Sequence, residues 1–289
     1  MAVHKAGRRA GRVAAAVAAA ALIGVAASAC GPDDGNDSGK GGGKSAGADE
    51  KPAASSDGPS DDSSDGPSGK RSPEAGADAD TPDADTPDAE APPAASSQLA
   101  DAPASVKGGV ITVGDPKAGH TVKVYEDPRC PFCKRFEDGG AQALVKPVAD
   151  GKVKVEYTIA SFLDNNLGGS GSVNAANALR ASVEAGKFPQ FHAAVFANQA
   201  EEETEDAYTP AFLLKIADKV EGLRGGAFDK AVTNGTYKKW VGEAMEAFSA
   251  DGIQGTPTVF IDGKKAGGGG NALYEQAAFA KELRAAGIS

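Results

Sequence analysis

The sequence predicts an α/β fold with a helical insertion, confined to residues 106–289. Two observations carry this prediction. Segments 122–126 and 152–159 alternate apolar and polar residues and flank a stretch of helical character, a pattern typical of a strand–helix–strand unit with parallel strands. Residues 170–250 then have apolar residues at helical spacing almost throughout, before one more strand and a closing helix.

The first 105 residues differ sharply in composition from the rest. Residues 31–105 contain 17 acidic and five basic residues and no Phe, Tyr, Trp, Ile or Met. A segment of this acidic Pro/Ser/Gly/Ala composition buries too little apolar surface to offset its chain entropy, so we expect a disordered linker. Residues 106–289 hold all the aromatic residues, enough for one packed domain. The charge pattern has no basic patch of the kind that binds nucleic acid.

Residues 1–30 have the pattern of a lipoprotein-type signal peptide. Four basic residues precede an apolar run over residues 13–27, which is short for a membrane span and typical of a signal-peptide core. At the end of this run, Ala27-Ser28-Ala29-Cys30 is similar to a bacterial lipobox, although Leu is usual where Ala27 stands. We expect an extracytoplasmic protein anchored through a lipid on Cys30 to the outer face of the cell membrane. The alternative is a secreted protein cleaved near Ala29.

The elements of the folded part follow in order. Val110–Val113 predicts a short strand, Val122–Glu126 a second and Lys152–Ile159 a third, each marked by β-branched residues or alternation. The segment that begins with Cys130 predicts a helix, because Pro is favoured in the first turn of a helix. We expect this helix to run to about Ala149, weakened by Gly139-Gly140.

The insertion and the C-terminal part complete the chain. Residues 170–250 predict several helices, one of which begins at Thr209-Pro210, a cap followed by a first-turn proline. Thr258–Ile261 predicts a strand, and the Asp262-Gly263 turn after it is a hairpin signal. Residues 273–286 predict the closing helix.

Cys130 and Cys133 form a Cys-x-x-Cys motif at the start of a helix that follows a strand. Unpaired backbone N–H groups and the helix dipole favour a thiolate at the first position, and the second thiol lies one turn along. Pro131 and Phe132, the intervening dipeptide, add no charge, and Arg129 is expected to place a cation next to the first thiol. If Cys30 carries a lipid, the other two cysteines are left as one pair.

Two other interpretations of the motif are a zinc site and an inert structural disulfide. A zinc site needs further ligands, and apart from carboxylates the sequence offers Cys30, His120 and His192 for this role. We expect no metal.

A second motif, Gly255-Thr256-Pro257-Thr258, stands directly before the last strand, and Pro is permitted at a strand entry. Together with Asp127-Pro128-Arg129-Cys130-Pro131-Phe132-Cys133 and the intervening helical block, it resembles the DsbA-like branch of the thioredoxin superfamily over residues 108–289. The resemblance implies a thioredoxin fold with a helical insertion between the βαβ unit and a cis-Pro strand.

The same resemblance implies the roles of the site residues. Cys130 would be the exposed nucleophile and Cys133 the buried resolving thiol. Pro257 would be a cis-proline facing them, and the Thr256 backbone would pair with an extended substrate. No cofactor is expected beyond the redox-active pair.

The sequence departs from the family pattern at two positions. Phe132 stands where the best-known oxidase has His, and Val124 stands six residues before the first Cys, where that oxidase has a buried Glu. His192 is expected to be a packing or surface residue.

The sequence therefore predicts a protein disulfide oxidoreductase, and most simply a dithiol oxidase that introduces disulfides into exported polypeptides with free thiols. Its other expected partners are a membrane redox protein and the membrane itself through Cys30, and the domain is expected to be a monomer. One alternative is a reductase or isomerase fed by a membrane electron donor. The other is a non-catalytic thioredoxin-fold binding module.

Overall fold

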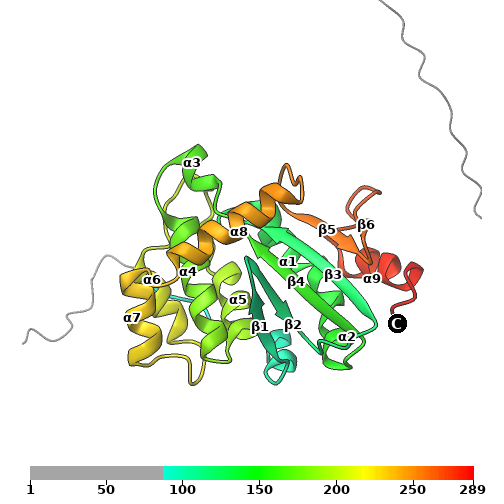
Figure 1. Ribbon diagram of the computed structural model, residues 1–289, viewed down its shortest axis with the longest axis horizontal. Coiled ribbons are helices and arrows are strands. Elements are labelled where there is room, and N and C mark those ends of the chain that lie inside the picture. The colour runs from blue at the N-terminus through cyan, green and yellow to red at the C-terminus, as the bar shows by residue number, and fades with distance from the viewer. Residues whose placement is uncertain (1–86) are drawn as a thin grey trace, which may run out of the picture. The chain divides into compact units, whose positions relative to one another are not determined.

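The computed structural model describes residues 87–289 (Figure 1). The expected signal peptide, Cys30 and most of the expected linker lie outside the described residues. The described strands are β1 (Ala104–Lys107), β2 (Val110–Val113), β3 (His120–Glu126), β4 (Val153–Ile159), β5 (Thr258–Ile261) and β6 (Lys264–Lys265). The helices are α1 (Pro131–Asp138), α2 (Val145–Ala149), α3 (Leu163–Leu167), α4 (Gly171–Glu184), α5 (Phe188–Ala197), α6 (Pro210–Ala217), α7 (Gly226–Asn234), α8 (Lys238–Ala250) and α9 (Gln276–Ala285).

The six strands form one mixed sheet in the order β1-β2-β4-β3-β5-β6. The two central strands, β3 and β4, are parallel and are joined through α1 and α2, so the predicted βαβ unit is confirmed. Strand β5 pairs antiparallel with β3, and the β5–β6 hairpin turns at Asp262-Gly263 as expected. Because Tyr125 pairs with Thr258, the last residues of β3 and the first residues of β5 lie next to each other, at the same ends of the two strands.

Helices cover both faces of the sheet. Helix α8 crosses in front of it in Figure 1, where Phe248 packs edge-on against Tyr125 of β3 at a centroid distance of 6.2 Å. On the opposite face Phe136 of α1 packs edge-on against Phe279 of α9 at 5.6 Å. The three-layer arrangement buries both faces of β3, where Val122, Val124 and Tyr125 are all buried.

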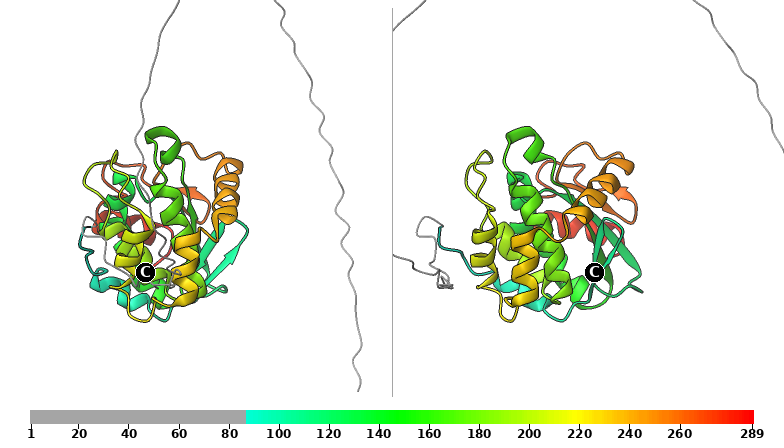
Figure 2. Two further views of the ribbon diagram at one scale, coloured as in Figure 1. Left: turned by 90° about the vertical axis from the view of Figure 1, so that its left-hand side faces the viewer. Right: turned by 60° about the vertical axis from the view of Figure 1, so that its left-hand side comes forward.

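Six helices, α3 to α8, make up the insertion between β4 and β5, and α4 to α8 confirm the predicted helical block. Helices α4, α5, α6 and α7 lie side by side next to the sheet (Figure 2). Helix α6 begins as expected, with the Thr209 side chain accepting a hydrogen bond from the backbone N–H of Phe212 at 3.1 Å. Among the described residues, no helix is long and apolar enough to span a membrane.

The predicted single helix from Cys130 to Ala149 is wrong. Helix α1 ends at Asp138, a 3₁₀ turn follows over Gly140–Ala143, and α2 begins at Val145. The break lies at Gly139 and Gly140, which the loop before α9 approaches closely. A Cβ added to Gly139 would lie 2.2 Å from the Tyr274 carbonyl oxygen, and one added to Gly140 would lie 2.1 Å from the Leu273 carbonyl oxygen. Only glycine fits this close approach.

The folded part also begins earlier than the expected boundary at residue 106. Ala104–Lys107 forms the edge strand β1, which the sequence analysis did not predict. We call residues 87–103 the N-terminal strap. Within it Ala94–Leu99 forms a 3₁₀ helix that lies against α2 and α5, and Glu90 exchanges two hydrogen bonds with the Asn198 side chain, at 2.6 and 2.9 Å.

Candidate active site

The two thiols lie where the predicted motif places them, at the start of α1 just beyond the end of β3. Cys130 is the N-cap residue in an extended conformation, and Pro131 occupies the first helical position. Cys133 lies one turn further along, with its backbone N–H bonded to the Cys130 carbonyl at 3.0 Å. Both are free thiols. Cys133 is fully buried, whereas Cys130 keeps 6% exposure, so the expected exposed nucleophile is only slightly accessible.

The environment of the pair separates the two thiols electrostatically. A hydrogen bond from the Cys133 thiol, helped by backbone N–H groups of Cys133 and Phe132, lowers the pKa of Cys130 to about 7 against the effect of burial. Burial raises the pKa of Cys133 well above its usual value. At neutral pH Cys130 is therefore partly ionised, and Cys133 stays a thiol that donates a hydrogen bond to it.

The loop before β5 faces the thiols. The Thr256–Pro257 peptide bond is cis, and the Thr256 carbonyl oxygen lies 3.4 Å from the Cys130 sulfur. The structure thus brings Thr256 and Pro257, predicted from a motif more than a hundred residues along the chain, to the reactive sulfur. Their role in binding substrate stays a prediction.

An aromatic rim stands beside Cys130. Phe132 is 51% exposed, and it is the one large apolar side chain so exposed among the described residues. It packs against Tyr274 at a centroid distance of 6.2 Å, and the Arg135 guanidinium lies over the Tyr274 ring at 4.5 Å. The rim leaves one exposed apolar ring next to the slightly exposed sulfur.

The expectation that Arg129 places a cation beside Cys130 is wrong. Its side chain is buried and extends into the helical insertion, where it donates to Asp164 at 2.8 Å and to the Gly168 carbonyl at 2.7 Å. The preceding Asp127, also buried, accepts from the Ser172 hydroxyl at 2.6 Å. Arg129 and Asp127 therefore hold the turn before the thiols against α3 and α4.

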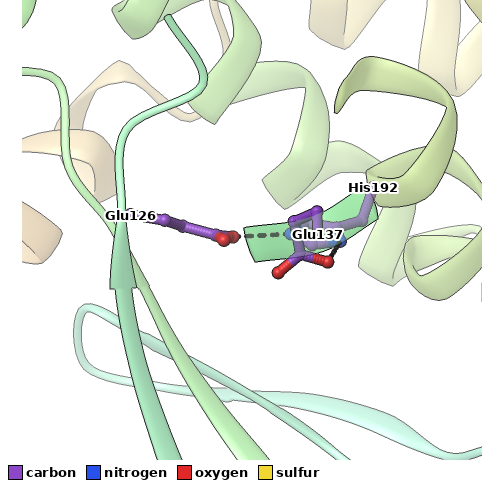
Figure 3. Close-up of side chains that lie close together, drawn as sticks. All are labelled: Glu126, Glu137 and His192. Carbon is purple, nitrogen blue, oxygen red and sulfur yellow. Dashed lines mark hydrogen bonds and ion pairs between the residues drawn. The ribbon is translucent and has the colours of Figure 1, made fainter. Parts of the chain in front are cut away.

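Glu126, Glu137 and His192 form a polar cluster that was not predicted (Figure 3), and Glu126 interacts electrostatically with both thiols. Glu126, the last residue of β3, is fully buried, and one of its oxygens lies 2.5 Å from His192 Nε2 on α5. The other ring nitrogen of His192 lies 3.8 Å from a Glu137 oxygen on α1. Strand β3 thus carries a buried Glu two residues after Val124, the position that the sequence comparison singled out.

Burial controls the charge of this cluster. It raises the pKa values of Glu126 and of Glu137 to about 8 each, and it lowers the pKa of His192. Near neutral pH the cluster therefore favours protonated carboxyls and a neutral imidazole. Glu126 and Cys133 also interact electrostatically, each making ionisation of the other less favourable.

Glu126 is close enough to Cys133 to act on it electrostatically, and its raised pKa leaves it protonated near neutral pH. When the Cys130–Cys133 disulfide opens, Cys133 leaves as a thiolate whose high pKa demands a proton, and a neutral carboxyl nearby can supply it. When the disulfide forms again, the ionised carboxylate can take the proton back. Glu126 has the burial and the raised pKa that suit this exchange.

Among the described residues, these three also form a group that could hold a metal ion, since one ligand atom from each lies within 4.8 Å of the others. The 2.5 Å separation of Glu126 and His192 is a hydrogen-bond distance. Two ligands of one ion at about 2.1 Å each would normally stand further apart, so the group fits a shared proton better than a metal.

Sequence reasoning missed this cluster although some signal was present. Glu126 ends the strand on the same alternating face as the buried Val122 and Val124, and His192 stands among Phe188, Phe191 and Phe196, all of which are buried. A polar residue in such surroundings requires a partner. Glu137 carries no comparable signal, because it stands on a short, mostly polar helix.

Comparison with known proteins agrees with this architecture. The family described as Thioredoxin matches residues 106–278, more than half of the chain, and the chain belongs to this family. It is similar to the reduced form of a disulfide bond oxidoreductase (DsbG) from Mycobacterium tuberculosis, with 26% identity, 66% of this chain and 90% of that chain covered, and a TM-score of 0.50. It is similar to MdbA, a thiol-disulfide oxidoreductase from Actinomyces oris, with 25% identity, 67% and 96% covered, and a TM-score of 0.52.

Oxidised BdbD from Bacillus subtilis shares the fold, with 21% identity, 70% and 98% covered, and a TM-score of 0.51. A curated relative, the Na(+)/H(+) antiporter NhaA 3 of Salinispora tropica, is 26% identical over 156 residues, which are 53% of this chain. The match spans about a fifth of the length of that relative (21%). The fold and these likenesses make the protein a thiol–disulfide oxidoreductase of the DsbA-like type.

Proposed function

We propose that the protein is a dithiol oxidase, which donates the Cys130–Cys133 disulfide to polypeptides with free thiols. The observation that carries this proposal is the asymmetry of the two thiols. The ionised Cys130 of the reduced form is stabilised by hydrogen bonds from Cys133 and the helix start. Whatever stabilises the reduced form makes the disulfide easier to give away.

The reaction runs in two exchanges. A substrate thiolate attacks the Cys130 sulfur, the Cys130–Cys133 bond breaks, and its electron pair goes to Cys133, which takes a proton. A second substrate thiolate then attacks the substrate sulfur of the mixed disulfide and releases Cys130 as a thiolate. The substrate dithiol loses two electrons, the protein gains them, and a membrane redox partner is proposed to reoxidise it.

A specific observation favours a second candidate, a reductase or isomerase. The pKa of Cys130, lowered to about 7, is less depressed than the about 3.5 of strongly oxidising thiols. Phe132 also contributes no positive charge to the thiolate. With hydrogen bonds as the stabilisation of its thiolate, Cys130 would form a less oxidising disulfide than such thiols do.

The reduction potential of the Cys130–Cys133 pair separates the two candidates. The proposal predicts a potential above about −200 mV when the protein is equilibrated with glutathione redox buffers, together with net oxidation of a reduced, unfolded substrate. A potential of about −270 mV, together with reduction of insulin disulfides, would favour the reductase. If the protein transferred disulfides in neither direction, the non-catalytic binding module would be the remaining candidate.

We further propose that the protein works outside the cytoplasm, where disulfides persist, anchored by a lipid on Cys30. The lipobox-like sequence and the pairing of the other two cysteines support this. Cys30→Ser is expected to move the protein from the membrane fraction to the medium or to leave its signal uncleaved, without changing the activity of the domain. Equal membrane retention of the variant and the wild type would contradict the anchor.

A further inference from the structure

The guanidinium of Arg135 is held in place by two aromatic rings. It lies 4.5 Å from the centroid of the Tyr274 ring and 5.8 Å from that of the Phe132 ring. The two rings come from α1 and from the loop before α9, and their centroids are 6.2 Å apart. Contacts between a cation and aromatic rings restrict a long side chain that would otherwise move freely, so this exposed charge has a defined position.

The backbone that carries the two rings is firmly packed. The loop with Tyr274 approaches the end of α1 so closely that neither Gly139 nor Gly140 has room for a Cβ. The backbone N–H of Tyr274 also donates to the Asn271 carbonyl at 2.8 Å. A binding group on such a support loses little freedom when a ligand arrives.

The Arg135 guanidinium has no acidic partner in the part of the chain that the structure describes, since no carboxylate there forms an ion pair with it. The acidic side chains that neighbour Arg135 and Tyr274 in the chain each contact another residue. They are Glu137, which lies 3.8 Å from His192, Asp138, which lies 3.4 Å from Lys134, and Glu275, which lies 3.1 Å from Asn271. The charge is therefore open to a carboxylate from outside the domain.

The same charge lies near the reactive sulfur. Burial raises the pKa of Tyr274 against the opposing effect of Arg135, and Cys130 and Cys133 add to the rise, so all of these groups lie within electrostatic range of its hydroxyl. The pKa of Cys130 itself is lowered by hydrogen bonds, the largest effect being that of Cys133. Ionisation of the thiol thus has its own cause, and the charge of Arg135 is left for another role.

We propose that Arg135, held by Phe132 and Tyr274, binds a carboxylate of the polypeptide substrate, so that the protein prefers cysteines with an acidic residue close by. A guanidinium offers a carboxylate two parallel N–H donors. Five residues of helix separate Cys130 from Arg135, about 7.5 Å along the axis. An extended substrate advances about 3.3 Å per residue, so an acidic residue about two positions from its cysteine reaches the guanidinium. This preference rests on the proposed exchange at Cys130.

The test compares two dithiol peptides that are identical except for Glu or Gln two residues after the first cysteine. Their oxidation by the full-length oxidised protein is followed by acid quenching and mass spectrometry near pH 7. Each rate is divided by the rate with glutathione disulfide, which corrects for the effect of the Glu on the pKa of the peptide thiol. The wild type is expected to prefer the Glu peptide about three- to fivefold, and less in about 0.5 M NaCl.

Variants assign this preference to the Arg135 charge and to its support. Arg135→Gln is expected to lower the ratio to about one, whereas Arg135→Lys keeps the charge without the two-pronged donor and retains part of it. Tyr274→Leu removes the ring that holds the guanidinium and should also lower the ratio. Arg284→Gln is the matched control, because Arg284 is likewise exposed but lies at the far end of α9 from Tyr274, and it should keep the wild-type ratio.

The inference is contradicted if the wild-type ratio lies below about two, or if Arg135→Gln keeps the wild-type preference. Faster oxidation of both peptides by Arg135→Gln would mean that the acidic segment of this chain, residues 31–105, occupies the guanidinium, and this would also overturn the inference. If the protein is a reductase, the same ratio is measured with the reduced protein and the oxidised peptides. Exchange in neither direction would contradict the proposed function itself, and the inference with it.

Discussion

At the scale of single residues, the site works by giving two chemically identical thiols different surroundings. Cys130 meets hydrogen-bond donors at a helix start, and Cys133, one turn away, meets apolar side chains and a carboxyl. One thiol is thus ready to ionise, and the other is held neutral. Glu126 completes this division, because it remains protonated at a pH where an exposed Glu would not.

A variant of Glu126 tests this account through pH. A carboxyl whose pKa is raised from 4.5 to about 8 on folding binds its proton more tightly in the folded state, so the domain loses stability as pH rises through that range. Glu126→Gln removes this loss. In urea unfolding of the reduced protein, the unfolding free energy of the variant should rise relative to that of the wild type from pH 5 to pH 8, by on the order of 1–3 kcal/mol.

The neutral His192 contributes a slope of the opposite sign. Because burial lowers its pKa, its effect lies below about pH 6.5, outside the upper half of that range. Glu243→Gln, a change on the exposed side of α8, is the control. A constant difference between Glu126→Gln and the wild type at both pH values would mean that Glu126 is ionised in the folded protein.

The chemistry-bearing residues differed in how well the sequence predicted them. Cys130, Cys133 and Pro257 stand in short motifs with a local physical reason. Glu137 and His192 become a pair only because α1 and α5 pack together, and Arg129 turns away from its sequence neighbour to reach Asp164. Contacts between distant segments leave little trace in one sequence.

At the scale of elements, the turn before the thiols is fastened to the helical insertion. Asp164 accepts from the Arg129 guanidinium and also from the backbone N–H groups of Ser172 and Val173 at the start of α4. The insertion therefore helps to hold Cys130 in place.

Asp164→Ala should be strongly destabilising, because it leaves the buried Arg129 guanidinium without its close carboxylate partner. The expected loss is about 3 kcal/mol of unfolding free energy in urea. Asp218→Ala, which breaks the exposed pair with Arg224, should cost less than about 1 kcal/mol. Equal losses in the two variants would contradict the buried anchor.

The elements themselves were largely predictable, since strands β2 to β5 and the helical insertion follow periodicity. The break after α1 was not, because the close approach of the Leu273 and Tyr274 carbonyls to Gly139 and Gly140 is a tertiary contact. The edge strand β1 was missed as well, since its four residues adjoin a segment with the composition of a linker.

At the scale of the whole molecule, the N-terminal strap joins the domain to the segment that is expected to reach the membrane. Full-length protein digested briefly with a nonspecific protease should leave a resistant fragment that begins near residue 87, because Leu99 and Ala102 pack against the core. Mass spectrometry of the fragment decides this. A fragment that begins near residue 106 would mean that the strap is not held on the domain.

The central claim is that Cys130 exchanges disulfides with substrates and that Cys133 completes the exchange from beneath. The most direct measurement is mass spectrometry of mixed disulfides trapped by single-cysteine variants. Cys133→Ser should accumulate adducts through Cys130 with thiol-bearing polypeptides, because no buried thiol remains to release them. Cys130→Ser should trap almost none, since Cys133 is buried and its pKa is raised. Adducts formed mainly through Cys133, or none with either variant, would contradict the account.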